Sequence, residues 1–197
     1  EMSQGYPRPS LNTSRKILGF GVPPQQLGIG ASFRYKDWNA SFLVEGKSGA
    51  QVFSGTNVRL IGYGLHQMTV PSGGREAGFV PDGVLEDGTP ITQSLDYTQQ
   101  QNYWGRYNDV AEAGIYDSDY FRMRQMSVGY TFPKTMLEGT FIQSASVSLI
   151  GKNLFFIHNS VPNVDPESAY NNSNSQGLEF AGMPVPTTVG INVNLKF

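Results

Sequence analysis

The chain has 197 residues, enough for one substantial domain, and its formal net charge of −2 does not indicate a nucleic-acid-binding surface. Only 15% of the residues are charged and 39% are hydrophobic, while 23 glycines, 12 prolines and 12% aromatics favour strands and turns over helices. The absence of cysteine excludes disulfides, thiolate metal sites and a cysteine nucleophile.

The sequence contains no recognisable membrane-spanning helix or signal peptide. No run approaches the ~18 apolar residues of a membrane-spanning helix. The opening stretch, EMSQGYPRPS, lacks the basic and apolar regions of a signal peptide. We therefore expect a cytoplasmic chain, a mature form or a piece of a longer protein.

Two adjoining segments near the N-terminus alternate between apolar and polar residues. LGIGASFRYK, residues 27–36, places apolar side chains at every odd position. WNASFLVEG, residues 38–46, places Trp38, Ala40, Phe42 and Val44 on one face and polar residues on the other, with Leu43 as the exception. This period of two is typical of β-strands. The stretch DWN, from Asp37 to Asn39, is a tight-turn signal. The pattern predicts a β-hairpin.

Residues 54–117 show no sustained alternation and are rich in Gly, Pro, Asp, Gln and Tyr. NVRLIGYGLHQM, residues 57–68, is compatible with a short helix. Connections longer than ~12–15 residues are unusual in compact domains and often carry a function. Such a connection usually has a function or is disordered, and it is the first indication that the strands do not pack as an ordinary soluble core.

The segment YFRMRQMSVGYTFP, residues 120–133, alternates in two phases. From Met126 onward the apolar residues occupy even positions, whereas Phe121 and Met123 occupy odd ones. A β-bulge near Gln125 explains this reversal, and so does a strand that leaves apolar surroundings for water. Pro133 ends the strand and opens a short connection.

The C-terminal third contains two further strand patterns. In IQSASVSLIGKNLFF, residues 142–156, Ala145, Val147 and Leu149 alternate with serines. A second long polar loop over residues 153–185 leads to VGINVNLKF, which alternates without exception from Val189 to Phe197. About five strands of roughly ten residues are therefore predicted, joined alternately by short turns and long loops.

These features predict an all-β fold, a transmembrane antiparallel β-barrel. Strands of about 9–11 residues cross a bilayer, and outer-membrane barrels combine short periplasmic turns with long extracellular loops. A β-sandwich would normally carry more Lys and Glu on its wet face. Five strands cannot close a barrel, and open edges cost several kcal/mol per unpaired backbone group in a bilayer. We expect either the C-terminal part of a larger barrel or an assembly of several chains.

Few residues suggest catalysis or metal binding. His66 and His158 are distant in sequence and lack acidic neighbours, so they do not indicate a metal pair. Asp165 and Glu167 in VDPES suggest calcium or paired carboxylates, but the proline between them favours a turn. We expect no metal, no cofactor and no enzymatic activity.

Aromatic residues are the more informative candidates. Tyr97, Tyr103 and Trp104 gather beside Arg106 in the first long loop, where flat rings and planar polar groups would suit a sugar or another substrate. The alternative is an aromatic anchor that folds the loop or docks a partner protein. A separate set resembles the interfacial girdle of a barrel: Phe33, Tyr35, Trp38, Phe132 and Phe141.

Several motifs resemble one known family. The stretches IYDSDYFRMRQMSVGYTFP, SASVSLIGKNLFF, NVDPES and the terminal NVNLKF are similar to the C-terminal barrel segment of SusC/RagA-type TonB-dependent outer-membrane transporters. SFRYKDWNASFLVEGKSGAQVF and GFVPDGVLEDGTPITQ, with the later DYTQQQNYW, also match that family's pattern. The resemblance begins at about Leu27, and residues 1–26 are a less certain loop or strand.

The resemblance implies a 22-stranded barrel in the outer membrane of a Gram-negative bacterium, with a plug in its lumen. It implies import of glycans or peptides, energy from TonB and a SusD-like surface lipoprotein as partner. The plug and the TonB box lie N-terminal in the family and are not in this chain. Residues 54–117 and 153–185 would be extracellular loops, and the turns at Asp37 and at residues 133–140 periplasmic.

The last strand resembles the signal that the barrel-assembly machinery reads. Val193, Leu195 and Phe197 would face lipid, and the strand would close the barrel against its first strand. The alternative is an ordinary edge strand that happens to end in phenylalanine.

Two other functions remain open for the chain: a secreted all-β carbohydrate-binding module, and a structural or adhesion barrel built from several chains. A binding module would purify without detergent.

Overall fold

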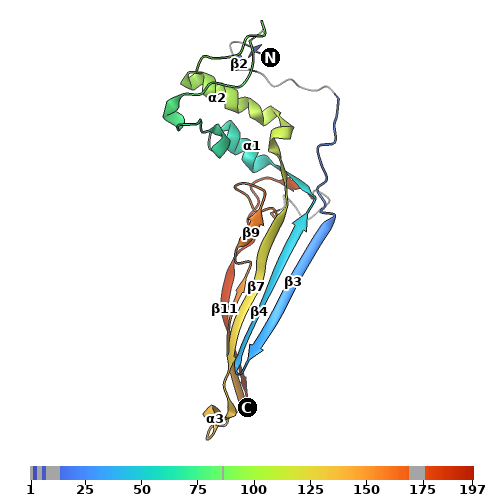
Figure 1. The fold of residues 1–197 in the computed structure, drawn as a ribbon, viewed down its shortest axis with the longest axis vertical. Coiled ribbons are helices and arrows are strands. Elements are labelled where there is room, and N and C mark those ends of the chain that lie inside the picture. The colour runs from blue at the N-terminus through green and yellow to red at the C-terminus, as the bar shows by residue number, and fades with distance from the viewer. Residues whose placement is uncertain (1, 4–5, 8–13, 86, 169–175) are drawn as a thin grey trace.

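The computed structural model describes residues 2–3, 6–7, 14–85, 87–168 and 176–197. Its main feature is a sheet of long strands, with the two longer helices, α1 (Gly55–Gly62) and α2 (Tyr97–Gly105), beyond one end and the last residue of the chain at the other (Figure 1). The period-two segments of the sequence form this sheet, and the segments without that period form the helical end and the loops.

The sheet contains the five predicted strands in the order β11-β8-β7-β4-β3, and every neighbouring pair is antiparallel. A short sixth strand, β9 (Phe156–Asn159), pairs with the first residues of β7. Within the described residues β3 and β11 are the two edges, so the sheet is open. The long strands are β3 (Gln25–Tyr35), β4 (Trp38–Ser48), β7 (Tyr120–Thr131), β8 (Ser144–Lys152) and β11 (Thr188–Lys196).

The register places most of the apolar residues of the five strands on one face, whereas Leu43 and Ile150 lie on the other. Residues paired across neighbouring strands point to the same side of a sheet, and Val147 is paired with both Tyr130 and Val193. This face is uncovered, with Ile191 73% exposed. Ten apolar residues that share this face are Ile29, Ala31, Phe42, Val44, Val128, Tyr130, Val147, Leu149, Ile191 and Val193. The opposite face carries Ser146, Ser148, Asn192 and Asn194.

A β-bulge keeps the two phases of β7 on consistent faces. Leu43 of β4 is paired with Gln125, but the next residue, Val44, is paired with Met123, which leaves Arg124 as an extra residue. The predicted bulge near Gln125 is confirmed. Because of the inserted residue, Met123 and Met126 both point to the apolar face although they are three positions apart.

The turn between β3 and β4 lies one residue earlier than predicted. It consists of Lys36 and Asp37, and Lys36 has a left-handed φ of 52°. Trp38 and Asn39, which the DWN signal placed in the turn, already belong to β4 because strands on both sides pair with them. The other short connection contains the one-turn helix α3 (Lys134–Leu137). Both connections lie at the end of the sheet opposite the helices (Figure 1).

Residues 54–117 are folded and are not an irregular loop. The predicted helix is α1 (Gly55–Gly62), which begins earlier and ends earlier than the segment 57–68 and is capped by Ser54. The fold is therefore an antiparallel sheet with an added helical unit. That unit also contains α2 (Tyr97–Gly105) and four 3-10 helices, η1 (Gln67–Thr69), η2 (Arg75–Ala77), η3 (Arg106–Asp109) and η4 (Ala111–Gly114).

None of the helices in the described part of the chain combines the length and apolar character that a bilayer crossing requires.

A small second sheet joins the helical unit to the second long loop. β5 (Gln51–Ser54) pairs with β6 (Ile115–Asp117) and, in parallel, with β10 (Leu178–Glu179). Buried Glu179 accepts hydrogen bonds from Ser54 Oγ at 2.7 Å and Thr56 Oγ1 at 2.6 Å. Near the N-terminus, β1 (Met2–Ser3) pairs with β2 (Tyr6–Pro7).

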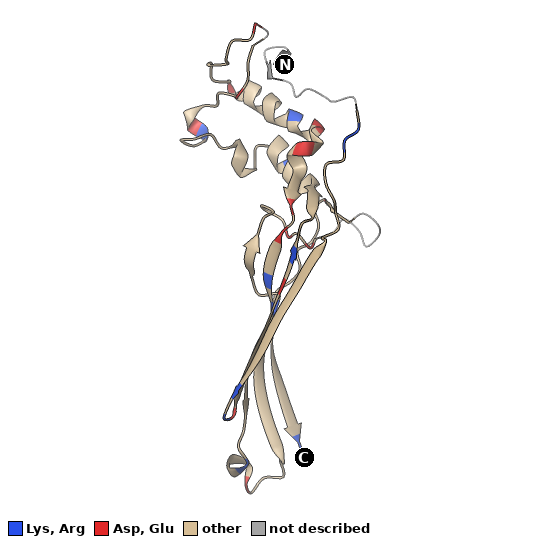
Figure 2. Cartoon of the chain, turned by 45° about the vertical axis from the view of Figure 1, so that its right-hand side comes forward, with Lys and Arg blue, Asp and Glu red and all other residues tan. Residues whose placement is uncertain are grey.

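Charged residues avoid the middle of the sheet. They lie at the turns, around the helices and at both ends of the strands, whereas the middle of the strands is free of them (Figure 2). Glu45 and Lys47 of β4 and Arg122 and Arg124 of β7 belong to the group nearest α1 and α2. The sheet thus has a long apolar face with charges confined to its two ends.

Candidate functional site

The predicted aromatic group divides into a packed cluster and one exposed ring. Tyr103 and Trp104 lie with their ring centroids 4.9 Å apart, and Phe79 packs on them at 5.1 and 5.0 Å. Tyr107 completes the cluster, 5.3 Å from Trp104. Burial, together with the hydrogen bond to Tyr107, raises the pKa of the Tyr103 phenol. These contacts support the anchor alternative for Tyr103 and Trp104, because they hold α2 to η3 and to the segment at Phe79.

Tyr97 differs from the cluster, since it is 83% exposed at the start of α2. It lies at the edge of a cavity of about 230 Å³ between α1 and α2, where one side of Trp104 also contributes. Arg106, at the C-cap of α2, does not line this cavity. Two of the four predicted substrate residues therefore meet at one cavity. Its remaining lining is Gly62, Tyr63, Gly64, Thr69, Arg75, Gln100 and Gln101.

Two polar side chains that line this cavity donate hydrogen bonds to backbone carbonyl groups. Nη2 of Arg75 donates to the carbonyl of Gly64 at 2.5 Å, and Nε2 of Gln100 donates to the carbonyl of Leu95 at 3.0 Å. Arg75 is the one charged residue among the lining. Sequence reasoning missed these residues, because Arg75 and α2 are 22 or more positions apart and no local pattern links them.

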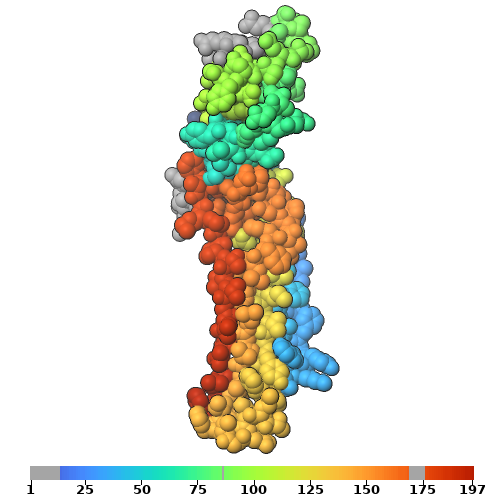
Figure 3. All heavy atoms as spheres, turned by 90° about the vertical axis from the view of Figure 1, so that its left-hand side faces the viewer, coloured from blue at the N-terminus to red at the C-terminus, as the bar shows by residue number. Residues whose placement is uncertain are grey.

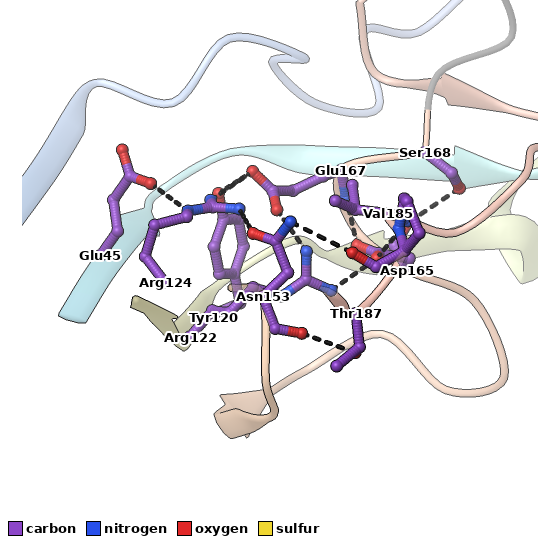
Figure 4. A network of polar contacts seen from close by, with 11 residues as sticks. Glu45, Tyr120, Arg122, Arg124, Asn153, Asp165, Glu167, Ser168, Val185 and Thr187 are labelled. Atoms are coloured by element: carbon purple, nitrogen blue, oxygen red, sulfur yellow. Dashed lines mark hydrogen bonds and ion pairs between the residues drawn. The ribbon is translucent and has the colours of Figure 1, made fainter. Parts of the chain in front are cut away.

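A second polar site fixes the long C-terminal loop to the sheet. Arg122 of β7 is 3% exposed, and its Nη2 lies 2.5 Å from Oδ2 of Asp165 while its Nη1 lies 2.6 Å from Oε2 of Glu167 (Figure 4). Its guanidinium carbon lies 3.8 Å from the ring centroid of Phe156. Buried charges require such partners, because an unpaired ion in a dry site costs several kcal/mol.

Arg124, the bulged residue, extends this ionic network to β4. Its Nε lies 2.5 Å from Oε2 of Glu45, and its Nη2 lies 2.8 Å from Oε1 of Glu167. Tyr120 Oη also donates to Glu167 Oε1 at 2.8 Å. One carboxylate of the loop therefore receives hydrogen bonds from three residues of β7. Figure 3 shows the segment that follows β8, in orange, directly beneath the helical unit.

The turn predicted at VDPES is present, but its carboxylates serve the network. The backbone N–H of Ser168 donates to the carbonyl of Asp165, and that of Glu167 donates to Oδ1 of Asp165, both at 2.9 Å. The sequence contained a signal for this pairing. In a chain with 15% charged residues, two arginines within a strand require acidic partners, and VDPES supplies two.

Glu167 makes the network sensitive to acid. Burial raises the pKa of its carboxyl, but hydrogen bonds from Arg124 and Tyr120 and the charges of Arg124 and Arg122 outweigh burial, so the pKa lies below the ordinary 4.5. A carboxyl whose folded-state pKa is depressed stabilises the fold above its unfolded-state pKa. That contribution is lost as the pH falls through the folded-state pKa.

We expect Glu167→Gln to lower the resistance of the folded protein to heat at pH 7 and to flatten its dependence on pH below about 4.5. The measurement is the unfolding temperature of the natural, full-length protein between pH 3 and 7. Glu138→Gln, in the exposed turn after α3, is the matched control and should leave both properties unchanged. Equal acid sensitivity of the wild-type and Glu167→Gln proteins would contradict the prediction.

The strand-end residues occupy the apolar face. Val193 and Leu195 of β11 are paired with Val147 and Ala145, and the ring of Phe197 stacks on Phe141 with centroids 5.6 Å apart. That packing contact was not predicted, and the role in barrel assembly stays a prediction. At the same end of the sheet the ring centroid of Tyr130 lies 5.0 Å from that of Trp38 and 5.4 Å from that of Phe132. A role of these rings in an aromatic girdle stays a prediction.

The two histidines lie on different elements. His66 is buried at the N-cap of η1, where its Nδ1 accepts from the N–H of Met68 and burial lowers its pKa. His158 lies on β9 and contacts Ser160 Oγ. Among the residues that the structure describes, no group of three His, Asp or Glu side chains is arranged to hold a metal ion.

Comparison with known proteins gives one curated relative and a set of solved structures, and no family model matches the chain. TonB-dependent receptor P3 of Formosa agariphila is 25% identical over 189 residues, which cover 93% of this chain and 17% of the receptor. The RagAB peptide importer superposes with TM-scores of 0.58 in its open-open state and 0.59 in its closed-closed state. Sequence identity to both is 14%, over 89% and 90% of this chain and 17% and 18% of theirs.

The chain is thus similar in sequence to part of a TonB-dependent receptor, and its sheet and helical unit have the fold of part of the RagAB importer structures. The predicted resemblance to a SusC/RagA-type segment is confirmed. These similar proteins are a receptor and an importer by name. The chain spans less than a fifth of their lengths.

Proposed function

We propose that this chain is the C-terminal barrel segment of a SusC-like, TonB-dependent outer-membrane transporter that imports glycans or peptides. The observation that carries the proposal is the uncovered apolar face of the sheet, with charges confined to its ends. A contiguous apolar face of five strands is unfavourable in water, at about 25 cal/mol per Å², but favourable against hydrocarbon chains. A soluble carbohydrate-binding module would bury this face in a core.

The two open edges support a larger barrel. Unpaired backbone groups at β3 and β11 would each cost several kcal/mol in a bilayer, so further strands pair with them. In a 22-stranded barrel those strands come from the rest of a longer protein, in agreement with the share of the relatives that this chain spans. The plug and the TonB-binding segment belong to that remainder.

The contrast between short turns at one end of the sheet and long segments at the other supports an orientation in the membrane. The end with the short turns is periplasmic, and the helical unit and the loop over residues 153–185 are extracellular. A SusD-like lipoprotein would meet this extracellular end, TonB would act through the plug side, and the barrel-assembly machinery would insert the protein. The structures of similar fold are named as importers of peptides, which supports a peptide alongside a glycan as substrate.

We expect a protease site inserted after Gly88 to be cut in intact cells, and the same site inserted after Gly139 to be cut only after the outer membrane is permeabilised. Both glycines have left-handed φ values, 83° and 84°, and open space around them, so they form a matched pair. The protein should remain in the membrane fraction until detergent is added. Release without detergent would instead support the soluble binding module, and the reverse pattern of cleavage would invert the orientation.

A further inference from the structure

The cavity between α1 and α2 has the features of a small anion-binding site. Its volume of about 230 Å³ is below the ~300–1,000 Å³ of sites that enclose a drug-sized ligand. It therefore suits one end residue of a longer molecule. It lies in the helical unit, at the end of the sheet farthest from the short turns (Figure 1).

Arg75 gives the cavity its charge. No acidic residue lines the cavity, and no carboxylate among the described residues forms an ion pair with Arg75. The hydrogen bond from Nη2 to the Gly64 carbonyl fixes the guanidinium and leaves its other N–H groups for a ligand. A fixed guanidinium with free donors binds a carboxylate through paired, charge-assisted hydrogen bonds.

Aromatic and amide side chains complete the site. The exposed rings of Tyr63 and Tyr97 stand at its rim, and the buried Trp104 lines its inner side. Flat rings contact the apolar face of a sugar or an amino-acid side chain, and the amides of Gln100 and Gln101 offer donors and acceptors to hydroxyl or peptide groups.

We infer that this cavity binds the carboxylate-bearing end residue of an oligomer, with Arg75 as the partner of the carboxylate and Tyr97 as a contact to the residue that bears it. The carboxylate comes from an acidic sugar residue or from the C-terminus of a peptide. The inference rests on the proposed transport function and names the chemistry of its substrate.

The test is calorimetric titration of the detergent-solubilised, full-length protein with two probes, trigalacturonate and a penta-alanine peptide with a free C-terminus. The neutral counterparts are a galactose trimer and the C-terminal amide of the same peptide. We expect one acidic probe to bind and its neutral counterpart to bind at least about tenfold more weakly. The probe that binds identifies the source of the carboxylate.

Arg75→Gln should weaken that binding by at least about tenfold, and Tyr97→Ala should also weaken it. Arg59→Gln is the matched control, since Arg59 lies on α1, contacts Asn108 and does not line the cavity. Binding of neither acidic probe, equal binding of acidic and neutral probes, or an unchanged Arg75→Gln protein would overturn the inference. Location in the outer membrane is measured separately, so failure of the transport proposal is distinguishable from failure of the site.

Discussion

Replacing Arg122 with methionine is expected to release the loop over residues 153–185 from the sheet. Methionine keeps the unbranched apolar stem but removes the guanidinium, so Asp165 loses its cation and Glu167 keeps only its pair with Arg124. Removal of one partner from a buried ion pair costs about 3–5 kcal/mol. Hydrogen exchange of the backbone amides of Glu167 and Ser168, which lie inside the network, should accelerate accordingly in the full-length protein.

A second variant separates loss of the cation from loss of packing. Combining Arg122→Met with Asp165→Asn and Glu167→Gln removes the uncompensated charges and should recover part of the protection. Arg34→Met is the matched control, because Arg34 lies on β3 and forms none of the described ion pairs. Unchanged exchange in the Arg122→Met protein would show that the loop is held by its other contacts.

A lysine at position 147 is expected to destabilise the inserted barrel, whereas a lysine at position 148 is expected to be tolerated. Val147 lies on the apolar face between Tyr130 and Val193, and Ser148 lies on the polar face between Gly129 and Asn192. Lysine on the lipid face near the bilayer midplane costs about 2–4 kcal/mol, and on the lumen face little.

Adjacent positions on one strand make this comparison well matched, because strand length, pairing partners and membrane depth are nearly the same. The measurement is denaturant unfolding of the full-length barrel in lipid bilayers. Equal tolerance of lysine at Val147 and Ser148 would show that β8 does not face lipid.

Local patterns predicted the strands well because each strand has one apolar and one polar face. The period of two is then present within a single segment, and a departure from it marked the bulge at Arg124. The turn at Lys36 was displaced by one residue, because pairing of Trp38 with both neighbours decided the strand boundary and DWN alone did not.

The helical unit was harder to predict because its helices are short and polar. α2 reads YTQQQNYWG and has little apolar periodicity, yet Asp96 and Gln99 form a capping box that the sequence contains as an Asp followed three positions later by Gln. The ion pairs of Arg122 and the cavity at Arg75 depend on contacts between distant segments. Residue types predicted that partners were needed, but only the fold determines which ones meet.

The buried pairing of β5 with β10 has a consequence for the order in which the chain folds. Ser54 and Glu179 are 125 residues apart, so the base of the helical unit stays incomplete until almost all of this segment has been synthesised. Contacts of such long sequence separation form slowly, because a large loop must close before they contribute. The base of the helical unit would thus form late, and a chain still bound to the ribosome before residue 179 would lack the contact between Ser54 and Glu179.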